Sequence, residues 1–211
     1  MDAYQTNILF MHTYSHAIYT WAIVRYMKRE ASHAAVWGTA GAALPDLPVL
    51  AKAGYLLWSR RDSITREELL EALEYFKEPS GKLDLMLHSL APVGSVLALY
   101  KALGLKAKDP HRALLSFLLG WVGHNLLDLP THAEDARPPF WPLSRWRWKS
   151  PLSYWDRKFY ALPLILVEHV AILMLVLTFL HQSYRGSVSD SQTDLSGHRS
   201  RLGYGPYWRQ P

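Results

Sequence analysis

"FYALPLILVEHVAILMLVLTFL", residues 159–180, is the stretch that decides the class of fold. It holds only two ionisable residues, Glu168 and His169. The hydrocarbon core of a bilayer needs about 20 mostly apolar residues as helix, and this run is long enough to cross it. Basic residues stand on both sides, Arg157 before it and Arg185 after it. The run therefore predicts a transmembrane helix.

Four further apolar segments precede this one, at residues 6–24, 34–58, 85–105 and 113–130. The second carries Asp46 between Pro45 and Pro48. Proline lacks a backbone donor and disfavours helix at the residue before it, so we expect two half-helices that meet at Asp46. Asp46 could serve a buried site there, or only cap the second half-helix. The pattern predicts an all-α, multi-span helical membrane bundle with about four to five transmembrane helices, one broken at Asp46.

Two stretches fall outside the bundle. Residues 63–77 combine a capping box, Thr65 and Glu68, with apolar residues at helical spacing. They predict a short amphipathic helix on the surface. Residues 183–211 are rich in Ser, Gly and polar residues and predict a disordered tail. The expected organisation is a helical membrane domain over 1–182 followed by this tail.

Composition narrows the class of partner. The nine Trp and twelve Tyr fit a membrane–water interface, where amphipathic rings gather. A net charge of +5 is too modest and too scattered to argue for nucleic acid. The chain contains no cysteine, so any metal ion must be held by His, Asp or Glu. Membrane lipids are the expected surroundings, and the oligomeric state stays open.

Every apolar segment carries an ionisable group that a plain membrane anchor would not keep. Such groups cost about 2.5–3.5 kcal/mol each at membrane depth, so they usually face the bundle interior and pair there. His124 and Asp128 are four residues apart, on one face of a helix, and can chelate one ion. The groups that can converge with them on one cavity are His16, Asp46, His88 and Glu168. Nitrogen and oxygen ligands without sulfur suit zinc, or manganese if carboxylates dominate.

A basic, aromatic loop follows this pair. In residues 137–158 the cations Arg145, Arg147 and Lys149 alternate with tryptophans. Arginine presents a planar fork to phosphate oxygens, so the loop could bind a phosphorylated substrate. It could equally be an interfacial belt without specificity.

The motifs "SHAIYTW", "GAALPDLPVL", "LMLHSLAP", "GWVGHNLLD" and "FWPLS…SPLSYWD" occur in this order over about residues 10–160. Together they resemble the bacterial membrane-bound metal-dependent hydrolase family, which is distantly similar to zinc-dependent phospholipase C. The resemblance implies a helical domain in the bacterial inner membrane with a zinc-type centre. It implies the metal ligands His16, Asp46, His88, His124 and Asp128.

Two other histidines and one carboxylate are looser candidates for this centre. His132 follows Pro130 in the loop, and His12 shares a helical face with His16. Asp84, four residues before His88, could orient its ring. Many members have a His-Arg-Gly-x-Thr run before the His-Ser pair, where this chain has "KLDLMLHS". A substrate contact made by that arginine or threonine is therefore not expected here.

The sequence thus predicts a membrane-embedded metal-dependent hydrolase that acts on a phosphoester, either a small molecule or a lipid, through a metal-activated water. Asp46, Asp128 or Glu168 could act as the base, and the remaining carboxylates would be ligands. The alternative is a non-enzymatic membrane protein that uses the same groups as an ion or proton pathway. A third possibility is a structural protein with buried polar pairs.

Overall fold

The chain is built from helices. The structure, a computed structural model, describes residues 3–27, 32–59, 65, 68, 81–154 and 157–201. Its helices are, in chain order, α1 (Ala3–Met27), α2 (Ser32–Ala43), η1 (Leu44–Asp46), α3 (Leu47–Ser59), α5 (Lys82–Leu87), α6 (Leu90–Ala102), η4 (Leu105–Lys108), α7 (Ala113–Asp128), η5 (Arg157–Phe159) and α8 (Ala161–Arg201). No strand occurs within these ranges, which confirms the predicted all-α class.

The predicted break at Asp46 is confirmed. A single 3₁₀ turn, η1, separates α2 from α3, and Asp46 is its last residue. Pro45 is buried at the start of this turn, where its missing N–H is not needed by a helix. The flanking residues Ala43 and Leu47 keep helical backbone angles, so no extended loop separates α2 from α3. This turn brings the Asp46 carboxylate into the bundle.

A second break divides the segment predicted as one apolar span over residues 85–105. α5 ends at Leu87, His88 follows it, and Ser89 adopts an extended conformation before α6 begins. The Ser89 hydroxyl accepts a hydrogen bond from the Ala91 N–H at 3.2 Å, as an N-cap residue does. Ser89 followed by Pro92, a proline tolerated in the first turn of a helix, marks this start in the sequence, so the break could have been predicted.

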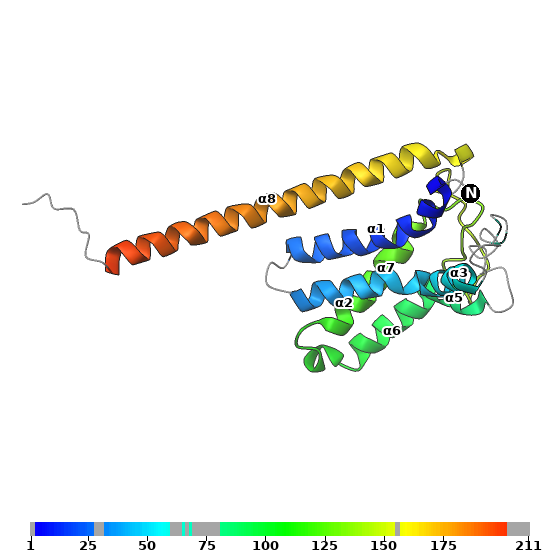
Figure 1. Cartoon of the computed structure of the whole chain (residues 1–211). Helices are drawn as coiled ribbons and strands as arrows, with labels where there is room; N and C mark the ends of the chain where they lie inside the picture. The colour runs from blue at the N-terminus through cyan, green and yellow to red at the C-terminus, as the bar shows by residue number, and fades with distance from the viewer. Residues whose placement is uncertain are drawn as a thin grey trace, which may run out of the picture. The chain divides into compact units, whose positions relative to one another are not determined.

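Small residues set the distance between α2 and α7, which pack along each other in the bundle of Figure 1. A Cβ added at Gly41 would lie 1.9 Å from the Phe117 carbonyl oxygen, and one at Gly120 would lie 2.0 Å from the Gly38 carbonyl oxygen. Both distances are far inside van der Waals contact. Only glycine therefore fits at these two positions, and the two backbones touch.

The other helices complete the bundle around this pair. α1 packs against α2, and α6 packs against α7. Between α5, α6 and α7 lies an apolar core that contains Leu87, Val93, Tyr100, Leu118 and Trp121. The Trp121 indole N–H donates to the Leu87 carbonyl, which ties α7 to the end of α5 just before His88.

The expected number of membrane spans is not supported. Among the described residues one helix, over Ala161–Arg185, is long and apolar enough to cross a membrane. α7 has 16 residues, or about 24 Å at 1.5 Å per residue, against a hydrocarbon core of about 30 Å. The segments at 34–58 and 85–105 are each divided by a break, and α1 is long enough but too polar.

By its contacts the chain divides into two compact units at Glu168, inside α8. α8 runs to Arg201, into the segment 183–211 for which the sequence predicts a disordered tail. The predicted helix over 63–77 lies mostly outside the described residues. Its capping box is present, since Thr65 and Glu68 exchange backbone-to-side-chain hydrogen bonds in both directions.

Candidate metal centre

His124 and Asp128 lie on one face at the end of α7, as their spacing predicts. Their His124 Nε2 and Asp128 Oδ2 atoms are 3.2 Å apart. The other ring nitrogen, His124 Nδ1, lies 2.7 Å from the carbonyl oxygen of Ala42 on α2. That bond is possible because the glycine contacts hold the two helices together, so the helix packing orients the histidine.

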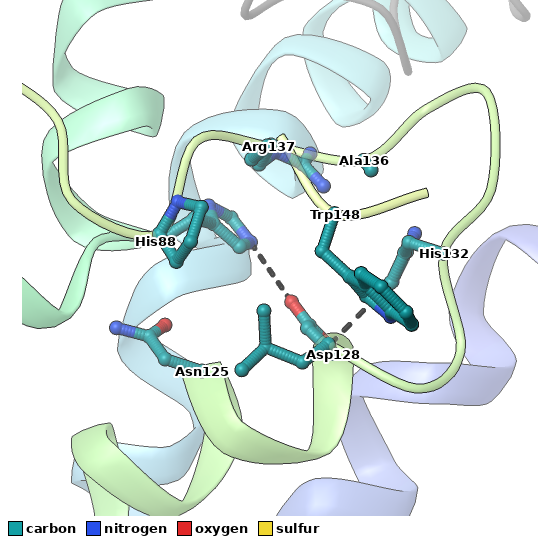
Figure 2. Close-up of a pocket in the computed structure, with 9 residues that line it drawn as sticks. His88, Asn125, Asp128, His132, Ala136, Arg137 and Trp148 are labelled. Carbon is teal, nitrogen blue, oxygen red and sulfur yellow. Dashed lines mark ion pairs between the residues drawn. The ribbon is translucent and has the colours of Figure 1, made fainter. Parts of the chain in front are cut away.

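The Asp128 carboxylate is the centre on which four histidines converge. Its Oδ1 lies 3.2 Å from His16 Nε2 and 3.5 Å from His132 Nε2. Its Oδ2 lies 3.2 Å from His124 Nε2 and 3.8 Å from His88 Nε2. Two of these pairs, those of His88 and His132, are drawn in Figure 2. Histidines from α1, from the break after α5, from α7 and from the following loop thus meet at one residue.

Asp46 supplies the second carboxylate of this group. Its Oδ1 lies 3.4 Å from His88 Nε2 and 3.8 Å from His124 Nε2. Its Oδ2 accepts a hydrogen bond of 2.6 Å from the Thr13 hydroxyl. One oxygen therefore faces the histidines while the other is held by α1.

The far sides of three histidine rings are occupied by acceptors. Besides the His124–Ala42 bond, His88 Nδ1 lies 3.0 Å from the Asp84 carbonyl oxygen, and His132 Nδ1 contacts the Asp135 carboxylate. An acceptor at Nδ1 requires that nitrogen to carry the proton in the neutral ring. The Nε2 lone pairs then point at the shared centre, which is the arrangement found in metal-bound histidines.

The spacing around the centre suits an ion. A tetrahedral zinc site with bonds of about 2.0–2.1 Å places neighbouring ligand atoms about 3.3 Å apart. The six nitrogen–oxygen distances from the histidines to Asp46 and Asp128 lie between 3.2 and 3.8 Å. Most exceed the usual range of a hydrogen bond. Two sets of three, His16–His124–Asp128 and Asp46–His88–His124, each hold their ligand atoms within 4.8 Å.

A buried ion pair lies on the side of His88 that faces away from the shared centre. Arg137 Nε donates to Asp84 Oδ2 at 2.7 Å, and Asp84 is fully buried. Burial opposes the charged guanidinium, but Asp84 outweighs it and raises the pKa of Arg137. The same carboxylate lies 3.4 Å from His88 Nδ1. Asp84 therefore joins the loop after α7 to a histidine of the centre, consistent with the orienting role expected for it.

Charged groups in the loop after α7 shift one another's pKa values. Burial lowers the pKa of His132, but the carboxylates of Asp128 and Asp135 outweigh it and raise that pKa to about 10. Burial raises the pKa of Asp135, but the contact with His132 outweighs it and lowers that pKa. In the ion-free protein His132 therefore carries a proton that a metal ion would displace.

Hydrogen bonds hold this loop against the bundle. The Ser89 hydroxyl contacts the carbonyl oxygens of Pro139 and Trp141 at 3.0 and 2.8 Å, and the Leu90 N–H donates to Pro139 at 2.8 Å. The Ser150 N–H donates to the His132 carbonyl at 2.9 Å. The cap of α6 is therefore also the point to which the loop is attached.

A cavity opens beside the centre, between α7 and this loop (Figure 2). The histidines His88 and His132 and the carboxylate Asp128 form one side of it. The rest of the lining is Asn125, Leu129, Ala136, Arg137, Pro139 and Trp148. It gives a small ligand access to the atoms that face the shared centre.

Several predicted site residues lie elsewhere. Glu168 is buried beside tyrosines: the Tyr19 hydroxyl donates to its carbonyl oxygen at 3.1 Å, and its carboxylate helps burial to raise the pKa of Tyr154. Arg145, Arg147 and Lys149 are exposed and are not among the residues that line the cavity. Lys149 pairs with Glu134. The side chain of His12 lies outside the described residues.

Four residues of the site were missed by the sequence analysis. Thr13 and Asp135 each stand three residues from a predicted histidine, so their positions relative to His16 and His132 could have indicated them. Asn125 and Arg137 gave no such signal. Asn125 is adjacent to His124, which on a helix normally points a side chain away, and Arg137 lies in an irregular loop.

No family model matches the chain, and neither a curated protein nor a solved structure is significantly similar to it. The resemblance of its motifs to the membrane-bound metal-dependent hydrolases thus stays a prediction, and the argument for function comes from the site.

Proposed function

We propose that this chain is a membrane-associated metal-dependent hydrolase. The observation that carries the proposal is the convergence of four Nε2 atoms on the carboxylates of Asp46 and Asp128. Histidines that only make hydrogen bonds in a core are not expected to direct four Nε2 atoms at the same pair of carboxylates. Here three rings are also fixed from behind, which prepares their lone pairs for a ligand at that focus.

For the ion we propose zinc, with manganese as the second choice, since the proposed ligands are imidazoles and carboxylates without sulfur. The proposed ligands are His16, Asp46, His88, His124, Asp128 and His132. Because each Asp128 oxygen faces two histidines, the carboxylate can serve one ion or bridge two. A zinc-type ion supplies a Lewis acid and a water of lowered pKa as the nucleophile.

Asp46 and Asp128 are the candidates for the base, since both carboxylates lie at the centre. Glu168 is the weaker candidate, because it lies among tyrosines. For the substrate we propose a phosphoester, either a lipid or a small molecule. Arg137 and Trp148 both line the cavity beside the centre. In this proposal they, rather than the exposed Arg145, Arg147 and Lys149, are the loop residues that contact the substrate.

Apolar side chains on the outside of the bundle support a membrane location. Among the described residues, large apolar side chains are exposed on helices that also form the core, for example Val36, Trp37, Leu99, Leu119 and Leu126. A contiguous apolar patch on the outside of a protein marks a surface that meets a membrane or another protein. Together with the apolar run of α8 over Ala161–Arg185, this favours lipid as the surrounding medium.

An ion or proton pathway is less consistent with the site. A pathway needs groups spread through the depth of the protein, whereas His16, Asp46, His88, His124 and Asp128 surround one point. A purely structural cluster predicts a different result for the experiment that follows.

Metal analysis of the purified full chain tests the proposal. We expect stoichiometric zinc in the wild type and a loss of most of it in His124→Ala and Asp128→Ala. The matched control is His111→Ala, which removes an exposed histidine that contacts His33 instead of the centre. Equal metal content in all four proteins would refute the proposal, and a loss of stability without a loss of metal would favour the structural alternative.

A further inference from the structure

One polar side chain at the cavity has no role in the cluster described above. Asn125 is 4% exposed, and neither atom of its carboxamide has a hydrogen-bond partner among the described residues. Leaving a buried donor and acceptor unpaired is costly, and nearly all buried polar groups in proteins are satisfied. This side chain therefore either holds a water molecule or binds a ligand.

Its surroundings favour a ligand. Asn125 lines the same cavity as His88 and Asp128 (Figure 2). A group bound to it would therefore lie close to the histidines and carboxylates of the proposed metal centre. The cavity has room for one or two water-sized groups but not for a whole substrate. A substrate would therefore place only one end in this cavity, and the rest of the molecule would remain outside it.

The chemistry of the carboxamide limits which chemical group can bind there. The amide group offers donors without a charge, so it can bind an anionic oxygen without competing for the metal. A tetrahedral phosphoryl group has several oxygens, so one can face the ion while another accepts from Nδ2. Arg137 lines the same cavity, with its charge balanced by Asp84.

We propose that the Asn125 carboxamide binds a phosphoryl oxygen of the substrate, so that the site accepts a phosphoester with its phosphorus next to the centre. This inference rests on the proposed function and names the contact that selects the substrate class. Asn125 is a binding residue in this scheme and is not a metal ligand.

The test is calorimetric titration of the zinc-loaded full chain with inorganic phosphate, together with zinc analysis and thermal unfolding. The variants are Asn125→Leu, which has a similar size without polar atoms, and Asn125→Asp, which has the same shape with a negative charge. The control is Leu126→Ala, the adjacent and exposed position on α7.

We expect full zinc content in every protein. Asn125→Leu should weaken phosphate binding about tenfold, the effect of losing one hydrogen bond to a charged group. Asn125→Asp should weaken it further, because its carboxylate repels the anion. Asn125→Leu should be at least as thermostable as the wild type, since an apolar side chain removes the unpaired buried groups.

The outcomes that contradict the two proposals differ. Phosphate affinity within twofold of the wild type in zinc-loaded Asn125→Leu overturns the role of Asn125 and leaves the metal site standing, and so does a zinc-loaded wild type that binds no phosphate. Loss of zinc in both Asn125 variants would make this residue part of the metal site and overturn the inference. A wild type that takes up no zinc overturns the proposed function and this inference with it.

Discussion

Asp128 shows how one residue can organise a site. Four histidines from four parts of the chain approach its two oxygens, two on each side. The sequence predicted the pairing with His124, because spacing on a helix is a local property. His16 and His88 were also predicted, with His132 as a looser candidate, but mainly from the resemblance of the motifs. Spacing alone could not show that they converge, since that depends on the rotation of each helix.

At the same scale, Asp84 should be needed both for stability and for the metal. Asp84→Asn removes the charge that Arg137 faces, and breaking a buried pair costs about 3–5 kcal/mol. Because Asp84 also contacts His88, metal affinity should fall about 10- to 100-fold. Urea unfolding and zinc titration measure the two effects.

The control for this prediction is Glu134→Gln. It breaks the ion pair with Lys149, whose two side chains are both mostly exposed. Exposed pairs contribute about 0–1 kcal/mol, so this variant should resemble the wild type. If Asp84→Asn and Glu134→Gln behaved alike in both measurements, the buried pair would have no structural role.

Among the elements, the contact between α2 and α7 depends on glycine. Gly120→Ala places a methyl group against the Gly38 backbone, which cannot move aside. The helices must separate, and overpacking of this kind costs about 1–3 kcal/mol. Separation also lengthens the His124–Ala42 hydrogen bond, so zinc affinity should fall as well. Thermal unfolding and zinc titration test both results.

Gly123→Ala is the matched control on the same helix. A Cβ at Gly123 meets no atom within 4 Å, so the substitution should leave zinc affinity unchanged. It should raise stability by up to about 1 kcal/mol, because alanine favours helix over glycine. A loss of stability equal to that of Gly120→Ala would contradict the packing argument.

The start of α7 provides a prediction about pH. Asp109 accepts hydrogen bonds from the N–H groups of Leu114 and Leu115 and from the Tyr100 hydroxyl. Burial raises the pKa of Asp109, but these bonds outweigh burial and lower it. A carboxyl whose pKa is lowered on folding stabilises the protein above its unfolded value, here 3.8, and loses this effect as the pH falls through the folded value.

Asp109→Ala should therefore cost about 1 kcal/mol at pH 6, the usual effect of losing a helix cap. The difference from the wild type should shrink when the pH falls below 3.8, as urea unfolding at each pH would show. Asp109→Asn keeps the acceptor without the titration and should be less dependent on pH than the wild type. A difference between wild type and Asp109→Ala that stays constant down to pH 2 would argue against the cap.

For the whole molecule, the sequence predicted the class of fold and the break at Asp46 but not the number of spans. The helical class follows from apolar periodicity, and the break follows from two prolines. The second break, at Ser89, had a local signal, because Ser89 caps α6 through Ala91 and Pro92 stands in the first turn. The two bonds from Ser89 to the loop, 50 and 52 residues further along the chain, had no such signal.

The proposed membrane location can be tested through α8. Leu173→Lys with Leu177→Lys places two charges on one face of the apolar run, at a cost of about 2.5–3.5 kcal/mol each. We expect the double variant to leave the membrane fraction after a carbonate wash, whereas the wild type remains in it. Tyr184→Lys is the control, because a lysine near the end of a span can extend to the interface. Equal retention of all three would contradict insertion of α8.

The attachment of the loop to Ser89 has a consequence for biosynthesis. His16, Asp46 and His88 are all synthesised before His124, Asp128 and the residues at 139 and 141 that hold the loop. A ribosome therefore releases half of the cluster well before the other half exists. Until residue 128 has been synthesised, His16 and His88 lack the carboxylate that they share, and the loop can be anchored to Ser89 only after residues 139 and 141 follow. Premature termination before Asp128 therefore yields a chain without half of the cluster.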